Sequence, residues 1–145
     1  MSIGPKEGHG FGFDQWDADD IDPLHGNVSV TDRYVKFFNL VLDDIQRDYP
    51  NVGLSFYCYS QHMRPPVREK PNSKILPVLA PIDIYQLHDI DNPHCWERQY
   101  IKKIIEGWKA LDVKMMYRGY LFNLADHGLP FSMIQQVRRE YPYYH

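Results

Sequence analysis

Three short runs of β-branched and aromatic residues constrain the fold of this chain most, because helical patterns lie before and between them. The runs cover residues 52–59, 75–80 and 113–120. One helical pattern precedes the first run, and another lies between the second and the third. Parallel neighbours need a crossover connection, so strands that alternate with helices indicate a parallel sheet. The sequence therefore predicts an α/β fold.

Three helices are predicted from apolar residues that recur at helical spacing. The first begins after a cap at Ser29 or Thr31 and ends before Tyr49, because the residue that precedes a proline is disfavoured in the α region. The second covers residues 95–111, and the third runs from residue 129 or 130 to about residue 140. The predicted apolar face of the second helix consists of Trp96, Tyr100, Ile101, Ile104, Ile105 and Trp108.

The number of strands bears on the architecture. Residues 61–74 contain three prolines and little periodicity, which predicts a loop with at most one helical turn. Three strands and a short N-terminal one over residues 1–4 are too few for a closed eight-stranded barrel, which takes about 250 residues. No Rossmann glycine fingerprint is present. We expect one domain over residues 1–145, a segment of a TIM-barrel-like (β/α)8 barrel with parallel strands whose N-terminal strands are missing.

Composition excludes several classes of function. The net charge of −3 provides no basic surface for nucleic acid, and no apolar stretch reaches the roughly 20 residues of a membrane helix. The first residues show no signal-peptide pattern, and the compartment stays open. Cys58 and Cys95 fit neither a disulfide framework nor a zinc pattern. Cys58 alternates within a predicted strand and is expected to pack as a small apolar side chain.

Polar and aromatic side chains gather where the predicted strands end. In an α/β fold with parallel strands, the ligand site forms at the C-terminal strand ends. The chain has 11 tyrosines, and a tyrosine offers both a flat ring and a hydroxyl group. The predicted substrate-binding residues are Tyr57, Tyr59, Gln61, His62, Asp83, His88, Arg118, Tyr120 and Asn123. These residues predict a sugar-binding or sugar-cleaving cleft; packing in the barrel wall is the alternative for each tyrosine.

Glu7 is the candidate catalytic general acid. It follows residues 1–4 in a glycine-rich turn, where a substrate can approach the backbone closely. Burial against Phe11, Phe13 or Trp16 would raise the pKa of this carboxyl, as a general acid at neutral pH requires. A solvated glutamate in an ordinary loop explains the same spacing, so both interpretations stay open.

Two clusters of potential metal ligands occur in the sequence, and neither is predicted to bind a metal ion. Residues 14–22 are rich in carboxylates, which suit Ca²⁺, but the glycine and glutamate of an EF-hand loop are not in place. Residues 88–95 contain His, Asp and Cys, and an Asn-Pro turn before a helix explains them more simply than zinc does. We expect no metal and no cofactor.

Several short motifs occur in an order that points to a family. They are Pro-Lys-Glu-Gly-x-Gly-Phe from Pro5, the helical segment 32–39, Tyr49-Pro50-Asn51-Val52 leading into Tyr57-x-Tyr59, Pro65-Pro66, the strand before Ala80-Pro81, the loop from His88 to Cys95, Trp108, and the tyrosine-rich strand that ends at Tyr120. In this order they resemble the bacterial domain of unknown function 4838. Its characterised members form glycoside hydrolase family 163, endo-β-N-acetylglucosaminidases that act on N-glycans. The resemblance covers nearly all 145 residues and corresponds to the later part of that domain.

The resemblance implies a barrel fold and a retaining hydrolysis assisted by the 2-acetamido group of the substrate, an exception to the usual pair of carboxylates. Where the family has Asn-Asp-Gly, this chain has Lys6-Glu7-Gly8, so Glu7 takes the place of the acid. Lys6 replaces the residue that would orient the acetamide. Phe13 and Asp14 stand in the region where the family has cysteines.

We therefore expect a glycoside hydrolase domain that cleaves a β-linked amino-sugar glycan. A non-catalytic carbohydrate-binding barrel and an inert fragment of a larger enzyme are the alternatives. The expected partner is a glycan or polysaccharide, with neither nucleic acid nor membrane, and the oligomeric state is not predicted. By the same resemblance, full-length relatives are expected to be secreted or periplasmic.

Overall fold

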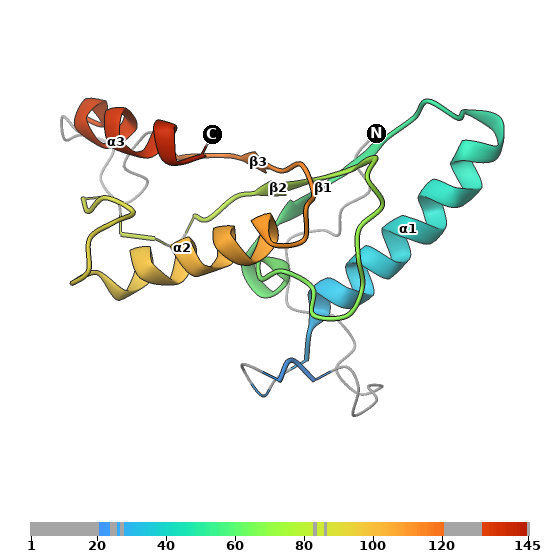
Figure 1. Cartoon of the computed structure of the whole chain (residues 1–145), viewed down its shortest axis with the longest axis horizontal. Coiled ribbons are helices and arrows are strands. Elements are labelled where there is room, and N and C mark those ends of the chain that lie inside the picture. Colours follow the sequence, from blue (N-terminus) through green and yellow to red (C-terminus); the bar gives the residue numbers. More distant parts are fainter. Residues whose placement is uncertain are drawn as a thin grey trace.

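The computed structural model describes residues 21–23, 26, 28–82, 84–85, 87–120 and 132–144 (Figure 1). The elements are α1 (Val30–Asp48), β1 (Leu54–Cys58), the 3₁₀ helix η2 (Ser60–His62), β2 (Ile75–Leu79), α2 (Trp96–Lys109), β3 (Met116–Tyr117) and α3 (Ile134–Tyr144). No described helix combines the length and the apolar character that crossing a bilayer requires.

The three strands form a parallel sheet in the order β1-β2-β3. In this register, Val78 at the centre lies between Tyr57 of β1 and Met116 of β3. The predicted α/β class with parallel strands is therefore confirmed. Closure of the sheet into a (β/α)8 barrel stays a prediction, because three strands do not define a barrel.

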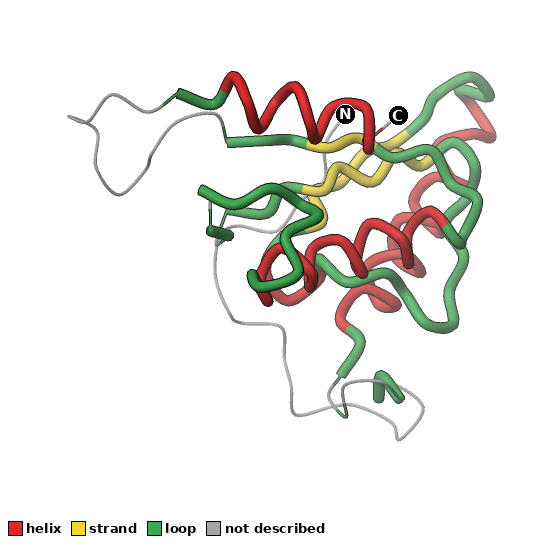
Figure 2. Tube along the Cα trace, turned by 60° about the vertical axis from the view of Figure 1, so that its left-hand side comes forward, coloured by secondary structure: helices red, strands yellow, loops and turns green. Residues whose placement is uncertain are grey.

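The two faces of the sheet differ in what covers them. We call the face of Leu54, Phe56, Cys58, Ile75 and Leu79 the covered face, because these side chains are buried against α1 and α2. Figure 2 shows both helices on the same side of the strands. From α1 and α2, the buried core includes Val35, Phe38, Leu42, Ile101, Ile104, Ile105 and Trp108. Cys58 is fully buried among them, as expected.

We call the opposite side the open face. Successive residues of a strand point to opposite sides, so Tyr57, Val78 and Met116 share this face. Tyr57 is 45% exposed and Met116 is 53% exposed. Within the described ranges, no helix packs over them, and Arg118 continues the same alternation just beyond β3.

Side chains of α1 hold the long loop between β1 and β2 in place. The Asp32 carboxylate accepts hydrogen bonds from the backbone N–H groups of residues 67–69, at 3.1, 2.9 and 2.8 Å. Asn39 lies seven residues further along the helix, hence on the same helical face. It accepts a hydrogen bond from the Asn72 N–H and donates one to the Lys70 carbonyl, both at 3.0 Å. These hydrogen bonds fix residues 67–72 of the loop against α1.

The prediction for the helix over residues 95–111 is confirmed, but its predicted apolar face is wrong at Trp96. This residue begins α2 beyond the end of the sheet, and its side chain is 74% exposed. Arg98 is instead completely buried, because a carboxylate from α3 lies opposite it.

The last strand and the last helix differ in length from their predictions. The ladder to β2 includes only Met116 and Tyr117 of the predicted strand 113–120, although exposure alternates along the whole stretch 112–118. Helix α3 begins at Ile134 and continues through Pro142 to Tyr144. A proline so close to the helix end removes little hydrogen bonding, and the Tyr144 ring stacks on Tyr117 at 4.1 Å.

Candidate functional site at the strand ends

Arg118 joins two predicted site residues on the open face. Its Nη1 donates a hydrogen bond to the Tyr57 hydroxyl at 2.8 Å. The guanidinium carbon lies 5.4 Å from the ring centroid of Tyr57 and 5.8 Å from that of Tyr120, which is within cation–π range. We call Tyr57, Arg118 and Tyr120 the arginine–tyrosine cluster.

The sheet places this cluster at the C-terminal strand ends. Tyr57 is the next-to-last residue of β1, and Arg118 directly follows β3. The backbone N–H of Arg118 donates to the Leu79 carbonyl at 2.8 Å, which continues the pairing with β2 by one residue. Two side chains that are 61 residues apart in the sequence therefore meet across one intervening strand.

A second feature at the same strand ends is a cavity of about 210 Å³. It lies between the ends of β1 and β2 and the beginning of α2, and its wall is mainly apolar. Its lining includes Tyr59, Ser60, Ala80, Pro81, Trp96 and Tyr100. Tyr59 was predicted here from its place at a strand end. Trp96 was missed, because its spacing matched the apolar face of the helix.

Three predicted residues, Gln61, His62 and His88, are not members of the arginine–tyrosine cluster. The His62 side chain is 5% exposed and stacks on Tyr34 of α1, with 4.4 Å between the ring centroids. Burial lowers the pKa of this imidazole to about 4, and a hydrogen bond to the Tyr57 backbone opposes that shift. His88 packs at 4.7 Å against the ring of Tyr85, in the loop before α2.

Gln61 and His88 each keep a buried polar atom without a hydrogen-bond partner in the described part of the chain, Oε1 and Nδ1 respectively. A role in ligand binding for Gln61, His62 and His88 stays a prediction. Three further predicted residues, Glu7, Asp83 and Asn123, lie outside the described residues, and so does the N-terminal glycine-rich turn.

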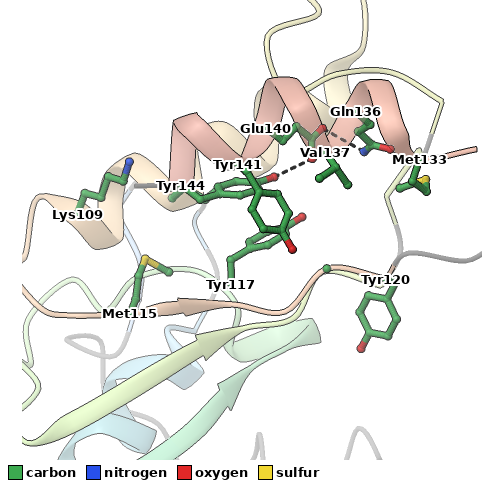
Figure 3. Close-up of a pocket in the computed structure, with 12 residues that line it drawn as sticks. Lys109, Met115, Tyr117, Tyr120, Met133, Gln136, Val137, Glu140, Tyr141 and Tyr144 are labelled. Atoms are coloured by element: carbon green, nitrogen blue, oxygen red, sulfur yellow. Dashed lines mark hydrogen bonds between the residues drawn. The ribbon is translucent and has the colours of Figure 1, made fainter.

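A larger cavity, of about 240 Å³, lies between α2, β3 and α3 (Figure 3). Its wall includes Tyr117, Tyr120, Gln136, Glu140, Tyr141 and Tyr144. Figure 3 shows Tyr117 pointing toward α3, whereas Tyr120 points away from that helix. Tyr120 therefore borders both this cavity and the open face.

Glu140 is the centre of a buried polar network beside the larger cavity. Its carboxylate accepts hydrogen bonds from Arg98 Nη1 at 3.1 Å, Gln136 Nε2 at 3.0 Å and the Tyr144 hydroxyl at 3.0 Å. Arg98 also donates from Nε to the Tyr85 carbonyl at 2.7 Å. Buried charges are tolerated when they are paired and hydrogen-bonded in this way. We therefore assign this network to the packing of α2 against α3.

Potential metal ligands do not gather in the described part of the structure. No group of three or more His, Cys, Asp or Glu side chains there could hold an ion. In the loop 88–95, Asn92 Oδ1 accepts a hydrogen bond from the His94 N–H at 2.9 Å. This contact confirms the predicted asparagine turn before α2. The carboxylates of residues 14–20 lie outside the described residues.

Of three comparisons with known proteins and families, one found a match, and it is to the family that the order of motifs resembles. No curated protein and no solved structure matches the chain. The family model described as Domain of unknown function (DUF4838) matches residues 9–145. Since this match includes far more than half of the chain, the protein belongs to the DUF4838 family.

Proposed function

We propose that this protein is a glycoside-hydrolase-like domain whose open face binds a glycan containing β-linked amino sugars. The observation that carries the proposal is the arginine–tyrosine cluster, which lies at the C-terminal ends of parallel strands on the open face. In barrels and open α/β sheets, this end of the strands holds the ligand.

The chemistry of the strand ends suits a sugar. Rings such as those of Tyr57 and Tyr120 offer flat apolar surfaces for the C–H face of a pyranose, and their hydroxyls can exchange hydrogen bonds with sugar hydroxyls. Trp96, exposed at the rim of the neighbouring cavity, adds a third large ring. Exposure of such rings stabilises the fold little, so ligand binding is a better explanation for them.

For catalysis, we propose Glu7 as the general acid and the substrate's acetamido group as the internal nucleophile. This step rests on the resemblance to endo-β-N-acetylglucosaminidases and on the glycine-rich turn around Glu7. Proton transfer from a positioned side chain contributes about 10²- to 10⁴-fold to a rate.

The test measures cleavage and binding separately on the full 145-residue chain. Fluorescently labelled chitotetraose and a complex N-glycan are incubated with the protein, and the products are separated by chromatography. Glu7→Gln should lower turnover by at least about 100-fold while glycan binding, measured by calorimetry, persists. Glu106→Gln on the exposed side of α2 is the matched control and should keep full turnover. Undiminished turnover in Glu7→Gln would remove Glu7 from the role.

A non-catalytic carbohydrate-binding domain is the second candidate. One observation favours it: in the described ranges, no Asp or Glu side chain contacts Tyr57, Arg118 or Tyr120. Glycan binding without any product, at every pH from 4 to 8, would support this candidate over the hydrolase. A bell-shaped pH profile of the rate would support the hydrolase.

A further inference from the structure

Arg118 is held in a defined position on the open face. One hydrogen bond to Tyr57 and the flanking rings of Tyr57 and Tyr120 restrict its guanidinium group. The backbone hydrogen bond to Leu79 fixes the base of the side chain. A planar guanidinium that is already oriented loses less conformational entropy when it binds a ligand. The guanidinium group of Arg118 is therefore oriented before a ligand binds.

The positive charge of Arg118 has no carboxylate partner in the described part of the chain. Its one hydrogen-bond acceptor there is the neutral Tyr57 hydroxyl, although a guanidinium has five N–H donors. Five other described arginines each face a carboxylate: Arg47, Arg64, Arg68, Arg98 and Arg139. Within the described residues, Arg118 therefore keeps its charge without a counter-charge and most of its donors without an acceptor, on an exposed surface.

Stability does not explain this arrangement. Arg118 and Tyr57 are both exposed, and contacts between exposed groups of this kind contribute about 1 kcal/mol or less. The chain as a whole carries a net charge of −3, so its overall field does not attract anions either. Among the described residues, Arg118 supplies the positive charge that lies beside the two tyrosine rings.

We propose that Arg118 recognises an acidic sugar, so that the glycan bound on the open face carries a carboxylate or a sulfate group. The fork of guanidinium N–H groups matches the two oxygens of such an anion, and charge-assisted hydrogen bonds of this type are strong. The rings of Tyr57 and Tyr120 stand beside the charge, where the pyranose that bears the acid would lie. This inference rests on the proposed function and specifies its substrate class.

The experiment compares ligands that differ only in charge. Calorimetry on the full chain measures the affinity for a hyaluronan tetrasaccharide, which alternates glucuronic acid with N-acetylglucosamine, and for its carboxyl-reduced, neutral form. A 6-O-sulfated chitotetraose and unmodified chitotetraose form the second pair. At least one acidic member should bind about 10-fold or more tightly than its neutral counterpart, as expected for hydrogen bonds to a charged group.

Variants assign the preference to Arg118. In Arg118→Gln the ratio of acidic to neutral affinity should fall toward one, and in Arg118→Lys it should be intermediate, because lysine keeps the charge without the fork. Arg47→Gln, which removes an exposed arginine at the end of α1, should retain the full ratio. Thermal unfolding of each variant confirms that it is folded.

The outcomes separate this inference from the proposed function. Equal binding of acidic and neutral glycans, or an unchanged ratio in Arg118→Gln, would overturn the inference and leave the proposed function standing. Failure of every glycan to bind would overturn both. Inorganic sulfate that binds as tightly as the acidic glycans would also overturn it, because the site would then recognise an anion without a sugar.

Discussion

Arg98 and Arg118 occupy opposite environments in the same small sheet. Arg98 is completely buried beside the covered face, where Glu140 and the Tyr85 carbonyl receive its hydrogen bonds. Arg118 is exposed on the open face, where tyrosine rings flank it. No carboxylate of the described residues forms an ion pair with it. The same residue type thus serves packing in one place and is available for binding in the other.

The two environments predict different effects of substitution on the two faces of the sheet. On the covered face, aliphatic and aromatic side chains fill the space between sheet and helices. The buried Arg98 is paired with Glu140 and the Tyr85 carbonyl, and only its Nη2 lacks a hydrogen-bond partner among the described residues. On the open face, large rings stay in contact with solvent. Substitutions on the covered side should therefore change the free energy of unfolding, and those on the open side should change ligand affinity.

The largest effect on stability is expected from Glu140→Ala. The change leaves the Arg98 guanidinium buried without its counter-charge, which costs about 3–5 kcal/mol for a buried pair. Urea unfolding followed by circular dichroism measures the loss. Asp91→Ala is the control, because it removes a pair with Lys102 in which the Asp91 side chain is 70% exposed, and it should cost about 1 kcal/mol or less. Equal costs for the two variants would contradict the assignment of Glu140 to packing.

A smaller effect is expected from Asp32→Ala. The variant leaves three backbone N–H groups of residues 67–69 without their acceptor. Because residues 67 and 68 are exposed and water can replace the carboxylate there, we expect a total loss of about 1.5–3 kcal/mol. Asp43→Ala on the exposed side of the same helix should be within about 0.5 kcal/mol of the parent protein. If the loop does not depend on Asp32, protection of its amides from hydrogen exchange will be the same in both variants.

Acidification should reduce stability in two separate steps. The folded pKa of His62 is about 4, below the ordinary 6.5, so the unfolded state binds more protons between these values. Stability should therefore fall as the pH decreases from 6.5 toward 4, by about 2 kcal/mol at pH 5. His62→Phe, which keeps a ring against Tyr34, should abolish this first step, whereas His94→Gln, an exposed control, should not.

The second step belongs to Asp32. Burial raises the pKa of its carboxyl, but hydrogen bonds from the backbone of residues 67–69 and from Ser29 outweigh burial, so the pKa lies below 3.8. This contribution is complete above pH 3.8 and is lost as the pH falls through the lowered pKa. In His62→Phe, the second step should remain; if stability is flat below pH 3.8, Asp32 does not have the assigned role.

The smallest effect on stability is expected on the open face and at the rim of the neighbouring strand-end cavity. Trp96→Ala and Tyr57→Phe should each change the free energy of unfolding by about 0.5 kcal/mol or less, because both side chains are exposed. Each should nevertheless weaken glycan binding several-fold in calorimetry. Tyr49→Phe is the control. Tyr49 is also exposed, at 64%, but it follows α1 on the side where β1 begins, which is the opposite end of the strands from the proposed site. Loss of affinity in Tyr49→Phe of the same size would remove the open face as the binding surface.

Local sequence patterns predicted most of the secondary structure. The long apolar periodicity of α1 and the alternation in β1 and β2 are signals within one segment, and the elements lie within two residues of their predicted bounds. Strand β3 was predicted too long, because a strand is defined by its partner and pairing with β2 ends quickly. The start of α3 was predicted too early, since the described residues 132 and 133 are not helical.

Contacts between segments that are distant in the sequence could not be predicted from local sequence patterns. A buried arginine such as Arg98 depends on Glu140, 42 residues away, and nothing near either residue indicates the pair. His62 follows a strand end in the manner of a ligand-binding residue, yet α1 supplies Tyr34 to cover it. Tyr57, Arg118 and Tyr120, in contrast, were predicted at strand ends, and parallel register brings them together.

The most direct measurement is a titration of the ¹⁵N-labelled full chain with the acidic and neutral glycan pairs, followed by two-dimensional NMR. We predict shifts at the Tyr57, Arg118 and Tyr120 amides and at the Trp96 indole N–H, with small changes at Arg98 and Glu140. Shifts confined to the surroundings of Glu140, or shifts that leave Arg118 and its two tyrosines unmoved, would contradict this prediction.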